Sequence, residues 1–518
     1  MKSPTSQPAP TPLPDLKARR SGLLLHLSSL PGPFYCGDLG KGAYRFAAFL
    51  QSAGQSWWQM LPVNPIGLGH SPYSTTCSFA GEPLFIDLEG LVADGLLRPS
   101  EIAPPPDPTP GRADYRRARR YRDVRLKKAF KRFTAGAGRF GAARFARFLE
   151  TQQYWIDDFA LFGVLANKFK TRDWRRWPAP LRRRRASALA QIRTDHRADL
   201  DYIQFLQFQF FIQWSRLKAD LRARGIGLIG DIPLFVGHQS SDVWAAQKYF
   251  QLRGDGSMRW VAGVPPDYFS ANGQLWGHPH FNWPAMQKDG FVWWVERLRH
   301  MTTLFDVVRL DHFIGFHHCW EVKAESQTAK HGRFRRTPGR DLFLAIRDAL
   351  GALPFIAEDL GAVVPGVYAL RDEFGLPGMR VLQFGFGQEA SAAYHLPFSY
   401  GPNAVVYTGT HDNDTVVGWY AEARQNARRG VVDLARCHHF LGGGTRQIHW
   451  AMIREAMKSV ANLSIFPVQD ILGLDGCARM NIPGKATGNW RWRLEDKALT
   501  AGLAKKLRRA TRAFGRHP

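Results

Sequence analysis

Short apolar runs that end in charged residues recur along the chain. The clearest is the stretch from Phe305 to Phe313, whose apolar, strand-like beginning gives way abruptly to charge. Because side chains alternate along a strand, Arg309 and Asp311 share one face of this run. A guanidinium that close favours the ionised form of the carboxylate. For this segment alone, an ordinary buried ion pair explains the residues as well as a reactive carboxylate does.

Five further runs repeat the pattern, each short, apolar and bounded by turn or polar residues. They are Gly227–Pro233, Pro354–Asp359 and Ala404–Asp412, which close on carboxylates, and Gly22–His26 and Trp58–Pro62, which close on polar or turn residues. Such runs are typical of fully buried strands in a parallel sheet. Polar groups at the carboxyl ends of parallel strands form the active site of a (β/α)8 barrel. Four acids at four strand ends are hard to explain as separate ion pairs, so the pattern predicts an α/β protein built on a (β/α)8 TIM barrel.

The composition of the segments between these runs predicts how the chain is divided into domains. Residues 1–20 carry little apolar content and are expected to form a disordered tail. The first barrel strands fall in residues 21–91, and a basic, mostly helical insertion occupies 92–225. The rest of the catalytic barrel with its ligand-binding loops is expected at 226–494, followed by a basic C-terminal helix at 495–518.

One connection, from Trp260 to Gly277, is long enough to be singled out. Loops of this length in a compact enzyme are usually functional. Its aromatic residues can stack on a sugar, while Asp267 and Gln274 can hydrogen-bond to hydroxyl groups. A packed Ω-loop without contact to any ligand is the alternative interpretation.

Composition limits where the protein works. With 518 residues, 45% of them hydrophobic, the chain can bury a large core. Its five cysteines are scattered and lack any C-x-x-C spacing, which indicates a reducing compartment and neither a disulfide framework nor a zinc site. No apolar run reaches the length of a membrane span, and the run after Arg19 and Arg20 lacks the features of a cleavable signal. We therefore expect a soluble, cytoplasmic protein with no membrane partner.

The charge suggests a different class of function. The net charge is +26, from 70 Lys and Arg against 44 Asp and Glu. Basic runs interleaved with aromatic residues, such as Tyr115–Arg122, are what binding to nucleic acid or to an anionic surface requires. Most such runs are solvated helix faces, however, so nucleic acid is kept as the remote alternative.

Many motifs together resemble the 4-α-glucanotransferase family, also called amylomaltase or disproportionating enzyme, within the α-amylase-like barrels. The resemblance spans residues 21–494. The motifs are His26-Leu-Ser-Ser-Leu-Pro-Gly-Pro, Ser71-Pro-Tyr, Gly230-Asp-Ile-Pro, Gly263-Val-Pro-Pro-Asp-Tyr-Phe-Ser, Arg309-Leu-Asp-His-Phe, Ala357-Glu-Asp-Leu-Gly, Gly375-Leu-Pro-Gly-Met, Gly409-Thr-His-Asp-Asn-Asp-Thr and Arg479-Met-Asn-Ile-Pro-Gly.

The resemblance implies transfer of α-1,4-glucan segments between maltooligosaccharides and linear α-1,4-glucans, without a metal or another cofactor. It implies that Asp311 is the nucleophile, Glu358 the general acid/base and Asp412 the stabiliser of the transition state. Further residues match family positions that bind the sugar. They are Ser71, Tyr73, Asp231, Asp267, Gln274, Trp276, Arg309, His411 and Asn481.

The residues agree with this chemistry. A retaining transfer needs one carboxylate that attacks and one carboxylic acid that donates a proton, about 5–5.5 Å apart. Arg309 is expected to keep Asp311 charged, whereas Glu358 follows an apolar strand, where desolvation raises its pKa. A glucan hydrolase on the same site is the nearer alternative, because water can replace the sugar acceptor. Branching or debranching fits the motifs less well, and the sequence does not indicate an oligomeric state.

Overall fold

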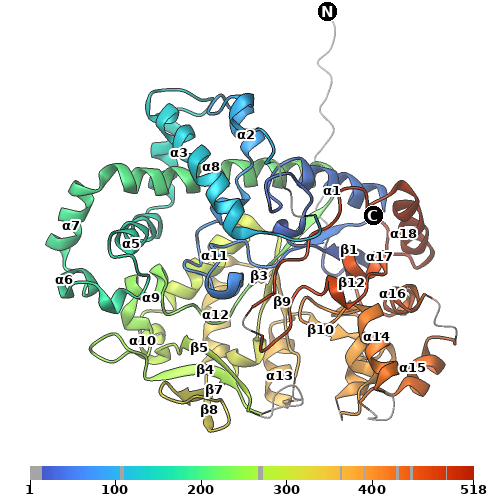
Figure 1. Ribbon diagram of the computed structural model, residues 1–518. Coiled ribbons are helices and arrows are strands. Elements are labelled where there is room, and N and C mark those ends of the chain that lie inside the picture. Colours follow the sequence, from blue (N-terminus) through green and yellow to red (C-terminus); the bar gives the residue numbers. More distant parts are fainter. Residues whose placement is uncertain are drawn as a thin grey trace, which may run out of the picture.

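Eight parallel strands close into a barrel at the centre of the molecule (Figure 1). The structure is a computed structural model that describes residues 15–105, 110–266, 272–361, 364–389, 391–426, 431–443, 447–485 and 487–518. Around the barrel the order of the strands is β1 (Arg20–Leu24), β12 (Leu463–Pro467), β11 (Ala404–Tyr407), β10 (Gly378–Val381), β9 (Phe355–Ala357), β6 (Val307–Leu310), β3 (Gly227–Ile232) and β2 (Trp57–Gln59). The predicted TIM barrel is confirmed.

The register of the strands brings the predicted acids to one end of the barrel. Leu310 at the end of β6 pairs with Ala357 at the end of β9. The pairing continues beyond the strands, since the Glu358 amide donates a hydrogen bond of 3.1 Å to the Leu310 carbonyl and the Asp311 amide one of 3.0 Å to Ile232. Asp231 near the end of β3 and the acids that follow β6 and β9 therefore lie next to one another.

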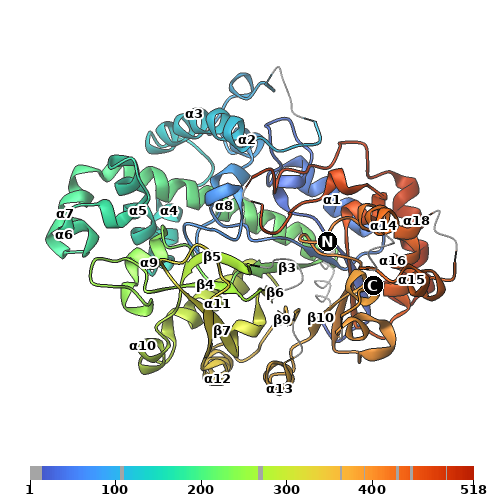
Figure 2. The same cartoon turned by 60° about the horizontal axis from the view of Figure 1, so that its bottom comes forward.

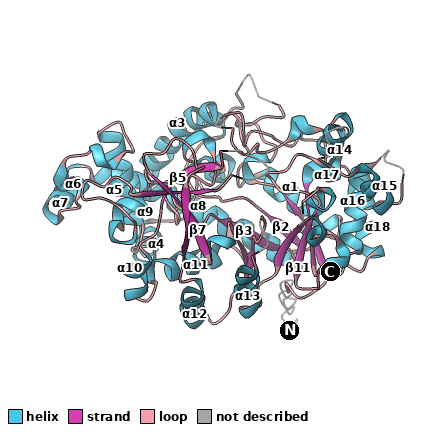
Figure 3. Cartoon of the chain, turned by 90° about the horizontal axis from the view of Figure 1, so that it is seen from below, coloured by secondary structure: helices cyan, strands magenta, loops and turns pink. Residues whose placement is uncertain are grey.

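Helices surround the barrel, as the view from below shows (Figure 3). The helices that follow barrel strands, or lie between them, are α1 (Lys41–Ser52), α9 (Ser241–Ala245), α10 (Trp283–Lys288), α11 (Val292–Leu304), α12 (Gly339–Leu350), α13 (Pro365–Glu373), α14 (Val416–Gln425), α15 (Leu434–Phe440), α16 (Ile448–Lys458), α17 (Val468–Leu472) and α18 (Ala501–Ala513). No helix in the described part of the chain is long and apolar enough to cross a membrane.

A helical region connects β2 to β3 and extends to one side of the barrel (Figure 2). Its helices are α2 (Leu88–Ala93), α3 (Tyr115–Thr134), α4 (Ala142–Thr151), α5 (Ile156–Lys168), α6 (Ala179–Arg182), α7 (Ala186–Asp195) and α8 (Arg197–Ala223). These helices fall within or next to the segment in which the sequence predicts an insertion. The first strand begins at Arg20, one residue before the predicted boundary of the tail. The exact domain boundaries stay predictions.

A second, antiparallel sheet is built from the connections that follow β3 and β6. Its strands, in order, are β5 (Gln274–Pro279), β4 (Trp260–Val264), β7 (His318–Lys323) and β8 (Gly332–Arg336). β7 begins just after the short helical turn that follows Asp311 and His312. This sheet is therefore tied to the carboxyl end of β6, and it carries Gln274 and Trp276 on its strand β5.

Candidate active site

Asp231 and Arg309 form the buried centre of the site. β3 and β6 pair so that these two residues stand opposite each other. One guanidinium nitrogen of Arg309 lies 2.8 Å and 2.9 Å from the two carboxylate oxygens of Asp231, and the Tyr73 hydroxyl donates a hydrogen bond of 2.6 Å to the same carboxylate. Asp231 is completely buried and Arg309 is 4% exposed. The charge-assisted contacts fix this pair, together with Tyr73, in one geometry.

Asp311 follows β6 and shares the same guanidinium, with its Oδ1 3.0 Å from Nη1 of Arg309. Burial raises the pKa of Asp311 to about 6, although the charge of Arg309 opposes that rise. The sequence predicted that Arg309 would determine the charge of Asp311. Desolvation outweighs it, because Arg309 is already paired with Asp231, whose negative charge also raises the pKa of Asp311. Asp311 is nevertheless ionised at neutral pH.

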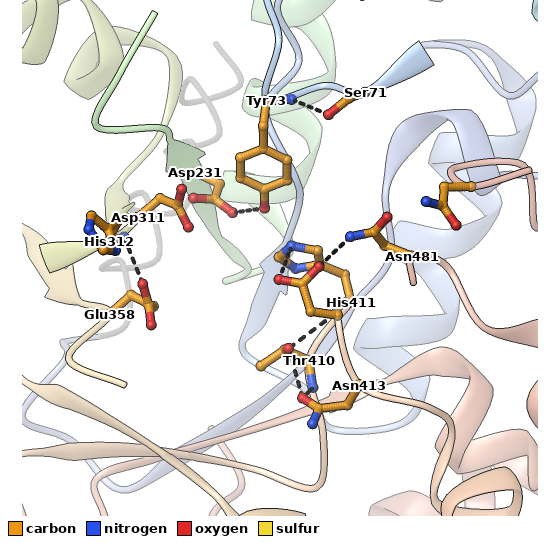
Figure 4. A network of polar contacts seen from close by, with 12 residues as sticks. Ser71, Tyr73, Asp231, Asp311, His312, Glu358, Thr410, His411, Asn413 and Asn481 are labelled. Carbon is orange, nitrogen blue, oxygen red and sulfur yellow. Dashed lines mark hydrogen bonds and ion pairs between the residues drawn. The ribbon is translucent and has the colours of Figure 1, made fainter. Parts of the chain in front are cut away.

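Glu358 follows β9 and lies beside Asp311 on the same side of the site (Figure 4). Its Oε2 accepts a hydrogen bond of 2.7 Å from the backbone amide of His312. Burial raises the pKa of Glu358 to about 8; Arg309 opposes this rise and the charge of Asp311 adds to it. The prediction from the apolar strand before Glu358 therefore has the right direction.

The two carboxyl groups hold different charges over a range of pH. Between about pH 6 and about pH 8, Asp311 is ionised while Glu358 retains its proton. Neighbouring carboxyl groups whose pKa values differ in this way can divide the roles of nucleophile and general acid between them. The pair is therefore equipped to cleave a bond whose leaving oxygen needs a proton.

Asp412 is held by groups that stabilise its charge. Asn481 donates a hydrogen bond of 2.6 Å to Oδ1, and Nε2 of His411 lies 3.3 Å from Oδ2. Burial alone would raise the pKa of Asp412, but His411 and Asn481 together bring it below its usual range. Asp412 thus offers a negative charge close enough to Asp311 to raise the pKa of that carboxyl group.

The remaining predicted binding residues that the structure describes occupy two places. The Ser71 hydroxyl accepts a hydrogen bond of 3.2 Å from the Tyr73 amide, and the Tyr73 ring stacks on His411 with ring centroids 5.1 Å apart. On β5, the Trp276 indole donates to the Gln274 side chain at 3.3 Å and its ring meets His312 edge-on at 4.8 Å. Trp276 therefore lies next to the turn that contacts Glu358. Asp267 falls outside the described residues, as do its neighbours Tyr268 and Phe269.

Sequence reasoning missed several residues that support the site. The Asn413 side chain accepts hydrogen bonds of 2.9 Å from both the amide and the hydroxyl of Thr410, which closes the turn that carries Asp412. Arg479 donates a hydrogen bond of 2.6 Å to the Asp412 carbonyl. The spacing of Thr410 and Asn413 is typical of a side-chain-capped turn and could have revealed this support. Nothing in the sequence pairs Arg479 with Asp412, which is far away along the chain.

A metal site is not part of this arrangement. Within the described ranges, no group of three or more His, Cys, Asp or Glu side chains is placed to hold a metal ion. The acids of the site instead meet arginine, histidine, asparagine and backbone amides.

The chain is similar over nearly its whole length to known proteins. Residues 25–500 match the family model described as 4-alpha-glucanotransferase. The chain is 43% identical over 504 residues to a 4-alpha-glucanotransferase of Synechocystis, with 97% of this chain and 99% of the relative covered. It is 42% identical over 500 residues to one of Thermus thermophilus, with 96% and 99% covered. Among solved structures, amylomaltase from Streptococcus agalactiae in complex with acarbose matches with a TM-score of 0.91 at 32% identity, covering 96% of this chain and 100% of that chain.

Proposed function

The chain belongs to the 4-alpha-glucanotransferase family, a family of retaining transferases that act on glucans, and on that basis we propose how its residues divide the reaction. Asp311 is the nucleophile, Glu358 is the general acid/base and Asp412 stabilises the transition state. Asp231, Arg309 and His411 hold the sugar at the point of cleavage. Ser71, Tyr73, Asp267, Gln274, Trp276 and Asn481 line the groove for the glucan.

The proposed reaction has two displacements. In the first, the Asp311 carboxylate attacks the anomeric carbon while Glu358 gives its proton to the departing 4-oxygen, so that a glycosyl ester forms on Asp311 and a shorter glucan leaves. In the second, Glu358 takes the proton from the 4-hydroxyl of an acceptor glucan, whose oxygen attacks the same carbon and releases Asp311. Two inversions retain the α configuration. Each step leaves Glu358 in the protonation state that the next step requires.

The observation that carries this proposal is the difference between the two neighbouring carboxyl groups. Glu358 has a pKa raised to about 8 by burial, and Asp311 one of about 6. Only this order of pKa values gives a proton donor and a charged nucleophile at neutral pH. The low pKa of Asp412 supports its role, because a carboxylate that stays charged can stabilise an oxocarbenium-like transition state.

The substrates proposed are maltooligosaccharides and linear α-1,4-glucans. Half-buried rings at the site, Tyr73 and Trp276, offer apolar faces for sugar rings, while Asp412, whose side chain is 46% exposed, and its partner Asn481 offer hydrogen-bonding groups for hydroxyls. A cytoplasmic location and the absence of a nucleic-acid partner stay predictions of the sequence.

Incubation with maltotriose tests this function against hydrolysis on the same site. Transfer produces glucose together with a ladder of products longer than maltotriose and leaves the total number of reducing ends constant. Hydrolysis raises the number of reducing ends and forms no longer products. We expect the ladder, measured by chromatography, with Asp311→Asn as the inactive control. A gain in reducing ends without longer products would assign the site to a hydrolase.

A further inference from the structure

A small cavity is lined by the residues on either side of Asp412 in its turn and by the end of β1 with the residues after it. Its volume is about 30 Å³. A cavity needs roughly 10–15 Å³ to hold one water molecule, and a bound water needs two or more polar partners. Polar side chains from three segments of the barrel line this cavity. They are His26, Ser29, Thr410, His411, Asn413, Asp414, Thr415, Gln469 and Asp470. The cavity therefore has both the room and the chemistry for bound water.

His26 is a buried histidine that lines this cavity. It follows β1, its side chain is 5% exposed, and its Nδ1 is buried without a hydrogen-bond partner among the described residues. The ring is held edge-on against Phe85, with centroids 5.5 Å apart. Burial lowers the pKa of His26 to about 3, with a smaller contribution from His411. A neutral imidazole held in this way must find a partner for Nδ1, because a buried polar atom without one is unfavourable.

The opposite wall of the cavity is the turn from Thr410 to Asp414. Within it, the hydroxyl and amide of Thr410 are bound by Asn413, and His411 contacts Asp412 through Nε2. The turn is stiffened on the side of the substrate by Asn481 and Arg479, which bind Asp412. Leu24 at the end of β1, and Leu25 and His26 after it, also line the cavity. A water that hydrogen-bonds to both walls would restrict the motion of the turn.

We propose that His26 is a positioning residue whose Nδ1 hydrogen-bonds to a water in this cavity, and that this water fixes the turn carrying His411 and Asp412. The inference rests on the proposed role of Asp412 as the stabiliser of the transition state. His26 itself does not touch the substrate. Its effect reaches the reaction through the orientation of Asp412, which acts more strongly on the transition state than on the bound substrate.

Two replacements of His26 separate its polar atom from its volume. In His26→Asn the side-chain amide stands close to the position of Nδ1, whereas His26→Leu fills similar space without a polar atom. We expect His26→Leu to lower kcat on maltotriose about 10-fold or more, the size of effect known for groups that orient metal ligands, with KM within about twofold. His26→Asn should restore kcat to within about threefold of wild type. Both variants are compared by thermal unfolding.

His300→Leu is the matched control. His300 lies in α11, is 2% exposed and is likewise a buried imidazole, whose pKa burial lowers to about 4. Its removal should leave kcat unchanged, because it lies outside the site. If His26→Leu keeps kcat within twofold of wild type, or raises only KM, the proposal is wrong. If His26→Asn is as impaired as His26→Leu, the ring packs against Phe85 and its polar atom has no role.

A second variant set distinguishes this failure from failure of the function proposed for Asp412. Asp412→Asn should be severely impaired, and adding His26→Leu to it should cost little more, since both changes remove the same interaction. Full activity of Asp412→Asn would overturn the role of Asp412 whatever His26 does. An independent readout is a high-resolution crystal structure. Density for a water at about 2.7–3.2 Å from His26 Nδ1 and from an atom of the Thr410–Asp414 turn is expected, and a dry cavity would overturn the proposal even if the variants failed to fold.

Discussion

At the scale of single residues, the guanidinium of Arg309 lies near three carboxyl groups, at a different distance from each. It is closest to Asp231, also contacts Asp311, and lies 3.9 Å from Glu358. One positive charge shared among three buried carboxyl groups cannot keep all of them ionised. Burial therefore prevails most at the most distant carboxyl group, Glu358, and its pKa rises furthest.

This order of pKa values predicts a bell-shaped dependence of kcat/KM on pH. Activity should rise as the pH increases through about 6, because Asp311 must lose its proton to attack. It should fall as the pH increases through about 8, because Glu358 must keep its proton to donate it. Initial rates on maltotriose over the range where the protein stays folded give the profile. A rate that continues to rise well above pH 8 would show that Glu358 is not the proton donor.

Replacement of Asp311 by asparagine is expected to abolish turnover without affecting the fold. The change removes the nucleophile but keeps the shape of the side chain, so the loss should reach several orders of magnitude in rate. Glucan binding, measured by calorimetry, and the unfolding temperature should stay close to wild type. A variant that retains more than about a tenth of the rate would place the nucleophile elsewhere.

At the scale of elements, the strands that carry acids were easier to predict than the strands that do not. β3 contains Asp231, β6 and β9 end directly before Asp311 and Glu358, and β11 leads into the loop that carries Asp412. The apolar runs of these strands were visible in the sequence. β10 and β12 were not predicted as strands. β10 contains the buried Arg380 and β12 contains Ser464 and ends in proline, so neither is a plain apolar run. Their pairing in the barrel, which depends on distant segments, makes them strands.

Some residues of the candidate site could be predicted from the sequence and others could not. Residues at strand ends could be predicted because the barrel dictates where strand ends meet. Asn481 was placed at the site only through the family resemblance, and the contact of Arg479 with Asp412 was not predicted. Both contacts depend on how a later loop folds back onto the site. The balance between burial and Arg309 at Asp311 depends on three-dimensional neighbours and could not be predicted from alternation along one strand.

Trp276 on β5 is expected to favour a sugar acceptor over water. Its ring lies beside His312, whose amide binds Glu358, so a sugar stacked on it would be held close to the proton carrier. Trp276→Ala should lower transfer more than hydrolysis, because water needs no such orientation. The measurement is the gain in reducing ends relative to products longer than maltotriose.

Trp260→Ala is the control for that experiment. Trp260 is a half-buried tryptophan of the same small sheet, but its ring packs under Arg333, with the guanidinium carbon 4.2 Å from the ring centroid. Its loss should leave the ratio of the two activities unchanged. A parallel fall of transfer and hydrolysis in Trp276→Ala would mean that Trp276 binds the donor or supports the fold. Acceptor selection would then depend on other residues.

At the scale of the whole molecule, part of the surplus positive charge is used inside the fold. The basic run Tyr115–Arg122 forms the start of α3. There Arg122 is buried and binds Asp38 at 2.6 Å, and Arg119 reaches the buried Glu82 at 3.4 Å. These contacts join the helical region to the loops after β1 and β2. A basic composition in this region thus has a structural use, apart from any anionic ligand.

Another buried arginine joins the two ends of the described chain. Arg516 follows α18, which lies beside α1 (Figure 1), and is fully buried. Its guanidinium donates to backbone carbonyls of Met457, Ala461 and Arg20 at 2.8 Å, 2.9 Å and 3.0 Å. Burial lowers its pKa to about 9. Arg516 therefore links the residues before β12 to the start of β1, next to the place where these first and last strands of the barrel pair.

Arg516→Leu is therefore expected to destabilise the protein by about 3 kcal/mol or more. Several buried carbonyls would lose a charged donor at once, and each unsatisfied acceptor is unfavourable. The unfolding temperature, measured by calorimetry, should fall clearly below that of Arg509→Leu, which removes an equal charge from the exposed side of α18. Equal unfolding temperatures for the two variants would contradict a role for Arg516 in closing the barrel.

The central claim is that Asp311 forms the covalent bond and Glu358 moves the proton, and a glycosyl fluoride tests both together. Fluoride leaves with little protonation, so Glu358→Gln should still form the glycosyl ester on Asp311 while being severely impaired on maltotriose. Without its base, the variant should release the ester slowly. Mass spectrometry of the digested protein should then find a peptide that contains Asp311 with the added mass of the glycosyl group, and fragmentation should place that mass on Asp311. A label on another residue, or equal impairment of Glu358→Gln on both substrates with no label, would contradict the account.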